Sequence, residues 1–300
     1  MRTRLLLLPF LSLTAALSRG EAQLMRVADV LSLPVNAPDL RSAYGPDSLQ
    51  FGELRLPEDK GLHPVVVIIH GGCWLNAYDL HLMDPMATAL TQAGYATWNL
   101  EYRRVGDEGG GWPGTFLDIA AGLNHLRELA SGHDLDLSRI VVIGHSAGGH
   151  LALWLAGQHQ LPGDSEIFTR DLVPISGVVS LAGITDPVTY LVREGQSCGT
   201  AVSGLLGGFP EDLPRRYQEA SPLALAPLGV RHILITGEED PIVPLAHISP
   251  YTDLAQEKGA KIKSIAVPGA GHFEVIAPGS NAWKEVEKAI RKLSKRKRKL

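Results

Sequence analysis

The strongest constraint in this sequence is a regular alternation of short apolar runs with helix-like segments, which begins near residue 50. The apolar runs are rich in β-branched residues and rarely alternate with polar ones, as expected for strands buried on both faces. They lie at 50–56, 65–69, 95–100, 140–143, 177–181, 233–236 and 262–267. Helical patterns fall between them at 81–93, 115–131, 147–158 and 246–258, and a last one begins near 281. The alternation predicts an α/β fold with a mostly parallel, doubly wound sheet.

One long segment interrupts this alternation. Residues 185–230 contain five prolines and a glycine-rich stretch at 204–208, and they are too many for a simple connection. We expect a small cap insertion of short helices that covers the substrate. The alternative is a structural excursion that touches no substrate. No repeat or linker divides the rest, so a single domain over 23–300 is predicted.

The first residues have the pattern of a secretory signal peptide. Arg2 and Arg4 precede an apolar run at 5–17, and Gly20 and Ala22 supply the small residues of a cleavage site. The run is shorter than the roughly 20 residues that a membrane-spanning helix needs. A signal peptide over 1–22 and a secreted or periplasmic protein are therefore predicted. The alternatives are an uncleaved membrane anchor and a buried N-terminal helix.

Charge is distributed unevenly along the chain. Residues 23–283 carry 16 basic and 29 acidic side chains, whereas nine basic residues crowd the tail at 284–300. An acidic body binds a phosphate backbone poorly, so no nucleic-acid partner is expected. The basic tail is interpreted as a solvated helix end, and binding to an anionic surface is the alternative.

The two cysteines form neither a disulfide scaffold nor a cysteine-based zinc site. In an oxidising compartment Cys73 and Cys198 are able to pair. The favoured interpretation is two separate buried thiols.

The strongest local signal is Gly-His-Ser-Ala-Gly at 144–148, between an apolar strand and a helical pattern. A serine on such a sharp turn is exposed at the carboxyl edge of the sheet, and the glycines relieve crowding around it. Ser146 is therefore the candidate nucleophile. The following helix directs its amino end at the site, where it stabilises developing negative charge.

An acyl-transfer enzyme also needs N–H groups that bind the oxyanion. The sequence His-Gly-Gly-Cys-Trp at 70–74 follows the strand 65–69, and we expect Gly72 or Cys73 to supply one donor. The second donor is the N–H of Ala147, directly after the nucleophile. His70 is expected to organise the turn, and Trp74 to pack nearby or contact the substrate.

A serine hydroxyl becomes nucleophilic when a base accepts its proton. His272 follows the last predicted strand in a glycine-rich loop, which suits that base. His247 is the competitor, in a helical segment that suits the role less. His145 and His150 flank the nucleophile and are expected to pack or to form hydrogen bonds at the turn.

The third member of a triad is an acid that orients the imidazole. Asp240 follows the strand 233–236 at a suitable distance and is the favoured candidate. Glu238, Glu239 and Asp186 are its rivals.

With these residues in place, the chain resembles the α/β-hydrolases over about residues 43–292. The segments 70–74 and 144–152 resemble those of kynurenine formamidase-like enzymes and small carboxylesterases, a group similar to feruloyl and acetyl-xylan esterases. The segments 237–244 and 271–272 are similar to the acid and histidine loops of that group. The resemblance implies the triad Ser146, Asp240 and His272. The related hormone-sensitive-lipase-like group usually has glycine where this chain has Cys73.

These observations predict a serine hydrolase that acts on a small-molecule ester and requires no metal or organic cofactor. The alternatives are an amidase acting on aryl formamides, a peptidase, and an inactive binding module. Formamidases of this group usually act inside cells, which the predicted export disfavours. Peptidases of the superfamily commonly carry a large extra domain, for which this chain has no room.

Overall fold

The computed structural model describes residues 23–192, 198 and 200–295. The predicted signal peptide at 1–22 and the last five residues of the basic tail lie outside this described part. Within it, no helix combines the length and the apolar character that crossing a membrane requires.

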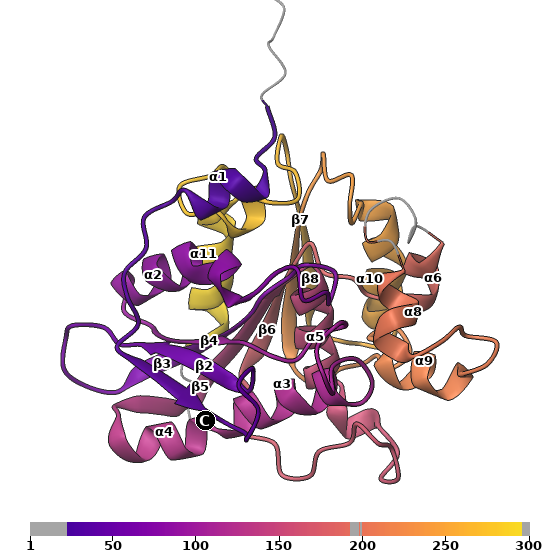
Figure 1. Ribbon diagram of the computed structural model, residues 1–300. Helices are drawn as coiled ribbons and strands as arrows, with labels where there is room; N and C mark the ends of the chain where they lie inside the picture. The colour runs from indigo at the N-terminus through magenta and orange to yellow at the C-terminus, as the bar shows by residue number, and fades with distance from the viewer. Residues whose placement is uncertain (1–22, 193–197, 199, 296–300) are drawn as a thin grey trace, which may run out of the picture.

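An eight-stranded sheet forms the centre of the described chain (Figure 1). Its strands are ordered β1-β2-β4-β3-β5-β6-β7-β8. All pairs from β4 through β8 are parallel, and β1 and β2 are antiparallel to their neighbours. The strands are β1 (Leu40–Ala43), β2 (Phe51–Arg55), β3 (His63–Ile69), β4 (Ala96–Leu100), β5 (Leu135–His145), β6 (Gly177–Leu181), β7 (Arg231–Gly237) and β8 (Ile262–Val267). The predicted parallel α/β sheet is confirmed.

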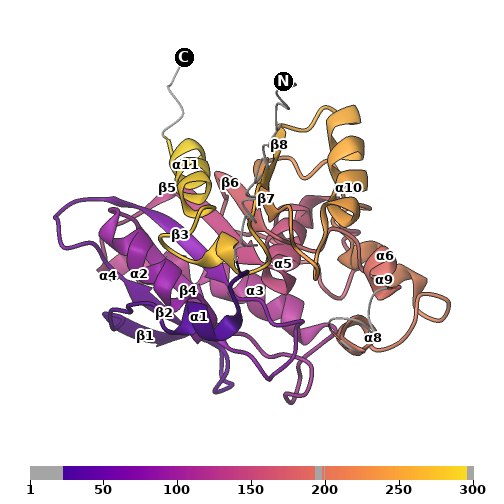
Figure 2. The same cartoon turned by 90° about the horizontal axis from the view of Figure 1, so that it is seen from above.

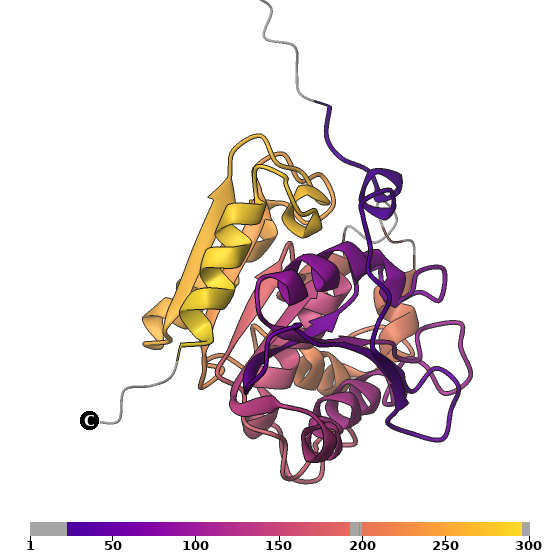
Figure 3. The same cartoon turned by 90° about the vertical axis from the view of Figure 1, so that its left-hand side faces the viewer.

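Helices cover both faces of this sheet. One face packs against α1 (Val27–Leu31), α2 (Asp84–Gln92) and α11 (Trp283–Leu293). Helix α11 packs against β6 and β7, and Figure 3 shows it in yellow, running along the orange strands. The other face packs against α3 (Gly114–Asn124), α4 (Leu126–Gly132), α5 (Ala147–Ala156) and α10 (Leu245–Glu257). Burying apolar side chains between sheet and helices is the main favourable contribution to this architecture.

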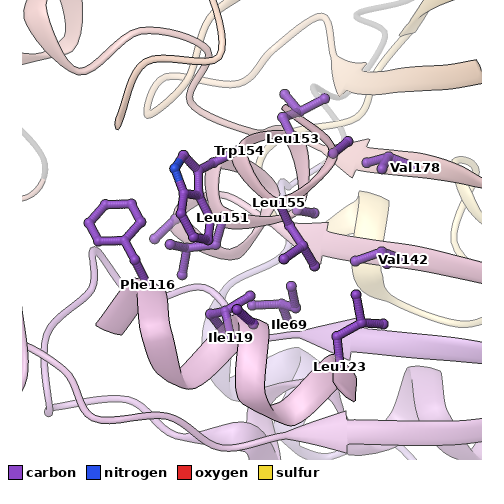
Figure 4. Packing of buried hydrophobic residues seen from close by; sticks show 14 of the residues in the cluster. Ile69, Phe116, Ile119, Leu123, Val142, Leu151, Leu153, Trp154, Leu155 and Val178 are labelled. Carbon is purple, nitrogen blue, oxygen red and sulfur yellow. The ribbon is translucent and has the colours of Figure 1, made fainter. Parts of the chain in front are cut away.

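Figure 4 shows this second core layer at close range. Phe116 and Ile119 of α3 lie opposite Leu151 and Trp154 of α5, and the rings of Phe116 and Trp154 form an edge contact with centroids 4.8 Å apart. Because α5 is buried along its whole length, the helix that follows the candidate nucleophile is held rigidly.

All seven predicted strands are present, and two predicted elements differ from the structure by more than a few end residues. The pattern at 115–131 is divided into α3 and α4, which meet at His125. The strand predicted at 140–143 begins at Leu135, because Leu135 and Asp136 pair with the first two residues of β3 before a register shift between Pro64 and Val65. The short β1 was not predicted, because its edge position leaves it partly exposed and without a continuous apolar run.

The segment between β6 and β7 contains short helices, as expected. They are α6 (Pro187–Leu191), α8 (Ala201–Leu206) and α9 (Pro214–Ala220). Figure 2 shows them gathered beside α5 and α10. The backbone of α8 at Gly204 packs against Val105, in the loop that follows β4. The segment therefore reaches the carboxyl edge of the sheet. Three short 3-10 turns complete the described elements, at Leu80–Met83, Gln158–Gln160 and Glu274–Ile276.

Candidate active site

Ser146 lies on the turn between β5 and α5, as the motif predicts. Its backbone has φ 53° and ψ −116°, a region that non-glycine residues rarely occupy. The Ser146 N–H donates to the Leu181 carbonyl at 2.8 Å, and the Ser146 carbonyl accepts from the His150 N–H at 3.0 Å. These two bonds hold the serine in its unfavourable conformation at the carboxyl edge of the sheet.

The glycines of the motif are required by close backbone packing. A Cβ atom on Gly148 would lie 2.2 Å from the Ile69 carbonyl oxygen and 2.4 Å from that of His70. A Cβ atom on Gly144 would lie 2.1 Å from the Gly148 carbonyl oxygen. Larger residues would push α5 away from β3 and displace the serine.

His272 and Asp240 form a buried pair. The Nδ1 atom of His272 lies 2.7 Å from Oδ2 of Asp240, and the two side chains are 5% and 0% exposed. A carboxylate only accepts hydrogen bonds, so Nδ1 of His272 donates to Asp240, and Nε2 is the ring nitrogen that faces away from this pair. The Oδ1 atom of Asp240 accepts from the N–H groups of Ile242 and Val243, at 2.8 and 2.9 Å. The aspartate is thus oriented by its own loop.

His145 brings the histidine loop against the nucleophile turn. Its Nε2 lies 3.0 Å from the His272 carbonyl oxygen, and the two rings have centroids 4.6 Å apart. His145 directly precedes Ser146, so this bond joins the two candidate catalytic residues through adjacent backbone. Burial, and then the charge of His272, lower the pKa of His145 well below its ordinary value. A neutral His145 donates through Nε2 and leaves Nδ1 without a proton.

The rival residues have other partners. Asp186 accepts hydrogen bonds from the N–H groups of Val188 and Thr189 and so caps α6. The Thr185 N–H donates to Nε2 of His247 at 3.2 Å. Glu238 and Glu239 are exposed. These observations favour Asp240 and His272 over the rivals.

The predicted oxyanion loop lies beside the nucleophile. A Cβ atom on Gly71 would lie 3.3 Å from the Cβ of Ser146. The next three residues all have positive φ, namely 103° at Gly72, 55° at Cys73 and 56° at Trp74. This curls the backbone sharply after β3.

A buried carboxylate that the sequence analysis did not identify supports this loop. Glu101 follows β4, next to β3 in the sheet, and its Oε1 lies 3.0 Å from Nε2 of His70. The Nδ1 atom of His70 lies 2.8 Å from the Gly71 carbonyl oxygen, so both ring nitrogens face acceptors. Burial acts to raise the pKa of Glu101, but His70 and Arg104 outweigh it and the pKa is lowered. The sequence signal that could have identified Glu101 is an acidic residue directly after a buried strand.

The structure bears on two further sequence interpretations. Trp74 was expected to pack nearby or to contact the substrate, and the structure shows the packing alternative, because Trp74 is 0% exposed and its ring packs edge-on against His150, with centroids 5.3 Å apart. It is a core residue. The two cysteines were interpreted as separate thiols, but Cys73 and Cys198 form a disulfide with Cα atoms 5.6 Å apart. The reason is that the insertion folds back over the oxyanion loop, which brings together residues 125 positions apart.

Comparison with known proteins places the chain in a family. The BD-FAE family model matches residues 53–251. The chain belongs to the BD-FAE family. This assignment agrees with the resemblance to esterase-like α/β-hydrolases that the motifs predicted.

Curated relatives of this BD-FAE family member are distant. An acylamino-acid-releasing enzyme of Arabidopsis thaliana is 26% identical over 70% of this chain and 27% of that protein. Esterase LipC of Mycobacterium tuberculosis is 24% identical over 79% of this chain and 60% of its own length. The chain spans less than two thirds of either relative.

Solved structures share the fold. A truncated carbohydrate esterase from gut microbiota matches with a TM-score of 0.73 at 23% identity, covering 85% of this chain and 95% of that one. A bacterial heroin esterase matches with a TM-score of 0.70 at 23% identity, covering 90% and 88%. The predicted α/β-hydrolase fold is confirmed.

Proposed function

We propose that this BD-FAE family protein is a serine hydrolase that cleaves carboxylic esters. The observation that carries the proposal is the strained Ser146 turn, which is joined to the buried Asp240–His272 pair by the 3.0 Å contact between Nε2 of His145 and the His272 carbonyl oxygen. Nucleophilic catalysis requires a serine on such a turn together with a histidine that an acid orients. The names of several relatives and structural neighbours, which are esterases, support the same activity.

In the proposed mechanism, Ser146 Oγ attacks the ester carbonyl carbon while Nε2 of His272 accepts the hydroxyl proton. Asp240 holds the imidazole in the required tautomer and stabilises its cation. The N–H of Ala147, together with that of Gly72 or Cys73, binds the oxyanion. His272 then donates the proton to the departing alcohol, leaving an acyl-Ser146 ester. Water, activated by the same histidine, releases the acid and restores the serine.

The predicted cellular location also belongs to this proposal. We propose that residues 1–22 direct export and that residues 23–300 act as one hydrolase domain with a small cap. The Cys73–Cys198 disulfide supports export, because disulfides persist in oxidising compartments and are rare in the cytosol.

An amidase is the second candidate, because one relative is an acylamino-acid-releasing enzyme. The same triad and oxyanion hole serve both reactions, and the difference lies in protonation of a poorer leaving group. Rates on matched acetate esters and acetanilides separate the two. The ester hypothesis predicts a kcat/KM at least about 100-fold higher for the ester, which corresponds to about 2.7 kcal/mol.

The decisive test is Ser146→Ala. We expect kcat on p-nitrophenyl acetate to fall by at least about 10⁴-fold, because the nucleophile is lost while binding groups remain. A fluorophosphonate probe should label Ser146 in the wild type and leave the variant unlabelled. Ser249→Ala is the matched control, since Ser249 is exposed on α10 and its hydroxyl donates to the Leu245 carbonyl in its own helix. Undiminished turnover by Ser146→Ala would overturn the proposal.

A further inference from the structure

The disulfide connects two functionally different parts of the protein. Cys73 belongs to the loop after β3 that contains the candidate oxyanion donors, and Cys198 belongs to the insertion between α6 and α8. Cys73 is itself one of the two candidate donors. The disulfide is therefore attached to a residue whose backbone N–H is a candidate donor to the oxyanion.

The flanks of this loop are held by hydrogen bonds. Upstream, Glu101 and the Gly71 carbonyl fix the His70 ring. Downstream, the Val105 N–H donates to the Trp74 carbonyl at 2.8 Å, which ties the loop to the chain after β4. Between these anchors, Cys73 adopts φ 55°, a conformation that a non-glycine residue keeps only under restraint. The disulfide acts on this residue directly.

The other end of the bond is anchored near the catalytic acid. The Tyr190 hydroxyl lies 3.4 Å from Sγ of Cys198 and 3.5 Å from the Ile242 carbonyl oxygen. Ile242 in turn donates its N–H to Asp240 at 2.8 Å. The oxyanion loop, the insertion and the acid loop therefore meet at the disulfide.

We propose that Cys198 is a positioning residue for the oxyanion hole, holding the Cys73 backbone through the disulfide in the geometry that binds the developing oxyanion. This inference rests on the proposed function. It assigns a role in that function to Cys198, which lies 125 positions from Cys73 in the sequence. Cys198 acts through Cys73 and needs no contact with the substrate. Without the bond, the loop samples other conformations, and the donor is aligned for only part of the time.

This role predicts a defect in kcat more than in KM, because an oxyanion donor acts mainly in the transition state. Complete removal of such a donor typically lowers kcat by about 10²–10³-fold. A donor that is present but less well aligned should cost less, so we expect Cys198→Ser to lower kcat by roughly 5–50-fold, with KM changed by less than about threefold.

The experiment compares three proteins at 25 °C, below the unfolding transition of each. They are the oxidised wild type, Cys198→Ser, and Tyr251→Phe as a control for stability. Tyr251→Phe removes a buried hydrogen bond of 2.8 Å to His232, between α10 and β7 and away from the oxyanion loop. We expect it to lower Tm with kcat unchanged, whereas Cys198→Ser should lower both.

Reduction of the folded wild type provides a second measurement that needs no variant. Dithiothreitol supplies two electrons and two protons, breaks the Cys73–Cys198 bond and leaves two thiols. While the far-UV circular dichroism is unchanged, kcat should fall to the value of Cys198→Ser, and reoxidation should restore it. Cys198→Ser itself should not respond to dithiothreitol.

The outcomes separate this inference from the proposed function. An active wild type whose kcat survives both reduction and Cys198→Ser overturns the positioning role and leaves the esterase intact. An oxidised wild type that hydrolyses no ester overturns the proposed function, and this inference with it. A lower Tm with unchanged kcat shows a purely structural disulfide and also overturns the positioning role.

Discussion

The two sides of Ser146 are held in place by different means. On the side of Asp240 and His272, the carboxylate is oriented by two neutral backbone N–H donors. On the side of the oxyanion loop, His70 is oriented by the buried carboxylate of Glu101, which also lies 3.2 Å from Arg104. The candidate acid–base pair is thus held by hydrogen bonds within its own loop, whereas the candidate oxyanion loop is held by buried charge and by a disulfide.

His145 is the connection between these two sides. It lies on the nucleophile turn, bonds the His272 carbonyl, and its Nδ1 lies 2.7 Å from where a Cβ atom on Gly71 would be. The His145 ring is therefore packed against both sides of the site. Variants that change the activity through one side only test whether the Asp240–His272 pair and the oxyanion loop are held independently.

Among variants of the two sides of Ser146, the largest effect is expected for Asp240→Asn. The asparagine oxygen can replace Oδ1 as acceptor for Ile242 and Val243, so the loop should keep its shape. The amide NH₂ then faces Nδ1 of His272 and favours the wrong tautomer, which should lower kcat by roughly 10³–10⁴-fold. Steady-state kinetics on a short acyl ester measure this.

Asp186→Asn is the matched control for that variant, because Asp186 caps α6 and asparagine is also a good cap. Its kcat should remain within about threefold of the wild type. A large loss in Asp186→Asn together with a small loss in Asp240→Asn would reverse the assignment of the acid.

A smaller loss of activity and a clear loss of stability are expected for Glu101→Gln. This change removes the negative charge that faces Arg104 and the His70 ring, and removing one member of a buried ion pair costs about 3 kcal/mol of unfolding free energy. The activity should fall by roughly 10-fold, because the oxyanion loop loosens while its N–H groups remain. Urea unfolding and ester kinetics provide the two measurements.

The pH dependence of the unfolding free energy provides a second test of the role of Glu101. Its pKa is lowered in the folded protein, so its contribution to stability is present above the pKa of the unfolded carboxyl and is lost as pH falls through the folded value. The difference in unfolding free energy between wild type and Glu101→Gln should therefore shrink in acid. A difference that stays constant down to pH 3 would contradict a stabilising, ionised carboxylate.

The smallest effect is expected for His145→Gln, compared with His145→Phe. Glutamine can still donate to the His272 carbonyl, so kcat should change by less than about threefold, whereas phenylalanine should lower it by roughly 10-fold. Because the pKa of His145 is depressed, its neutral form contributes stability that is lost as pH falls below about 6.5, the unfolded value. The phenylalanine variant should lose that part of the pH dependence, which thermal unfolding at pH 5 and pH 8 would measure.

Much of the fold was predictable because its signals are local. A strand buried on both faces must be continuously apolar, and a helix that covers it must have a 3.6-residue pattern, so the alternation was visible without coordinates. The turn at Ser146 was predictable for the same reason, since its glycines are required by contacts within a few residues and with the adjacent strand. The catalytic roles of Ser146, Asp240 and His272 remain predictions that the experiments above address.

The partners of residues distant along the chain depend on the order of the strands. Glu101 meets His70 because β4 lies beside β3, and Cys73 meets Cys198 because the insertion folds back over the same edge. Trp74 is buried because the loop curls inward after β3. A local apolar pattern records whether a strand is buried but carries no information about which strand lies next to it. The contacts between residues distant in the sequence are therefore the part of this site that only the tertiary structure determined.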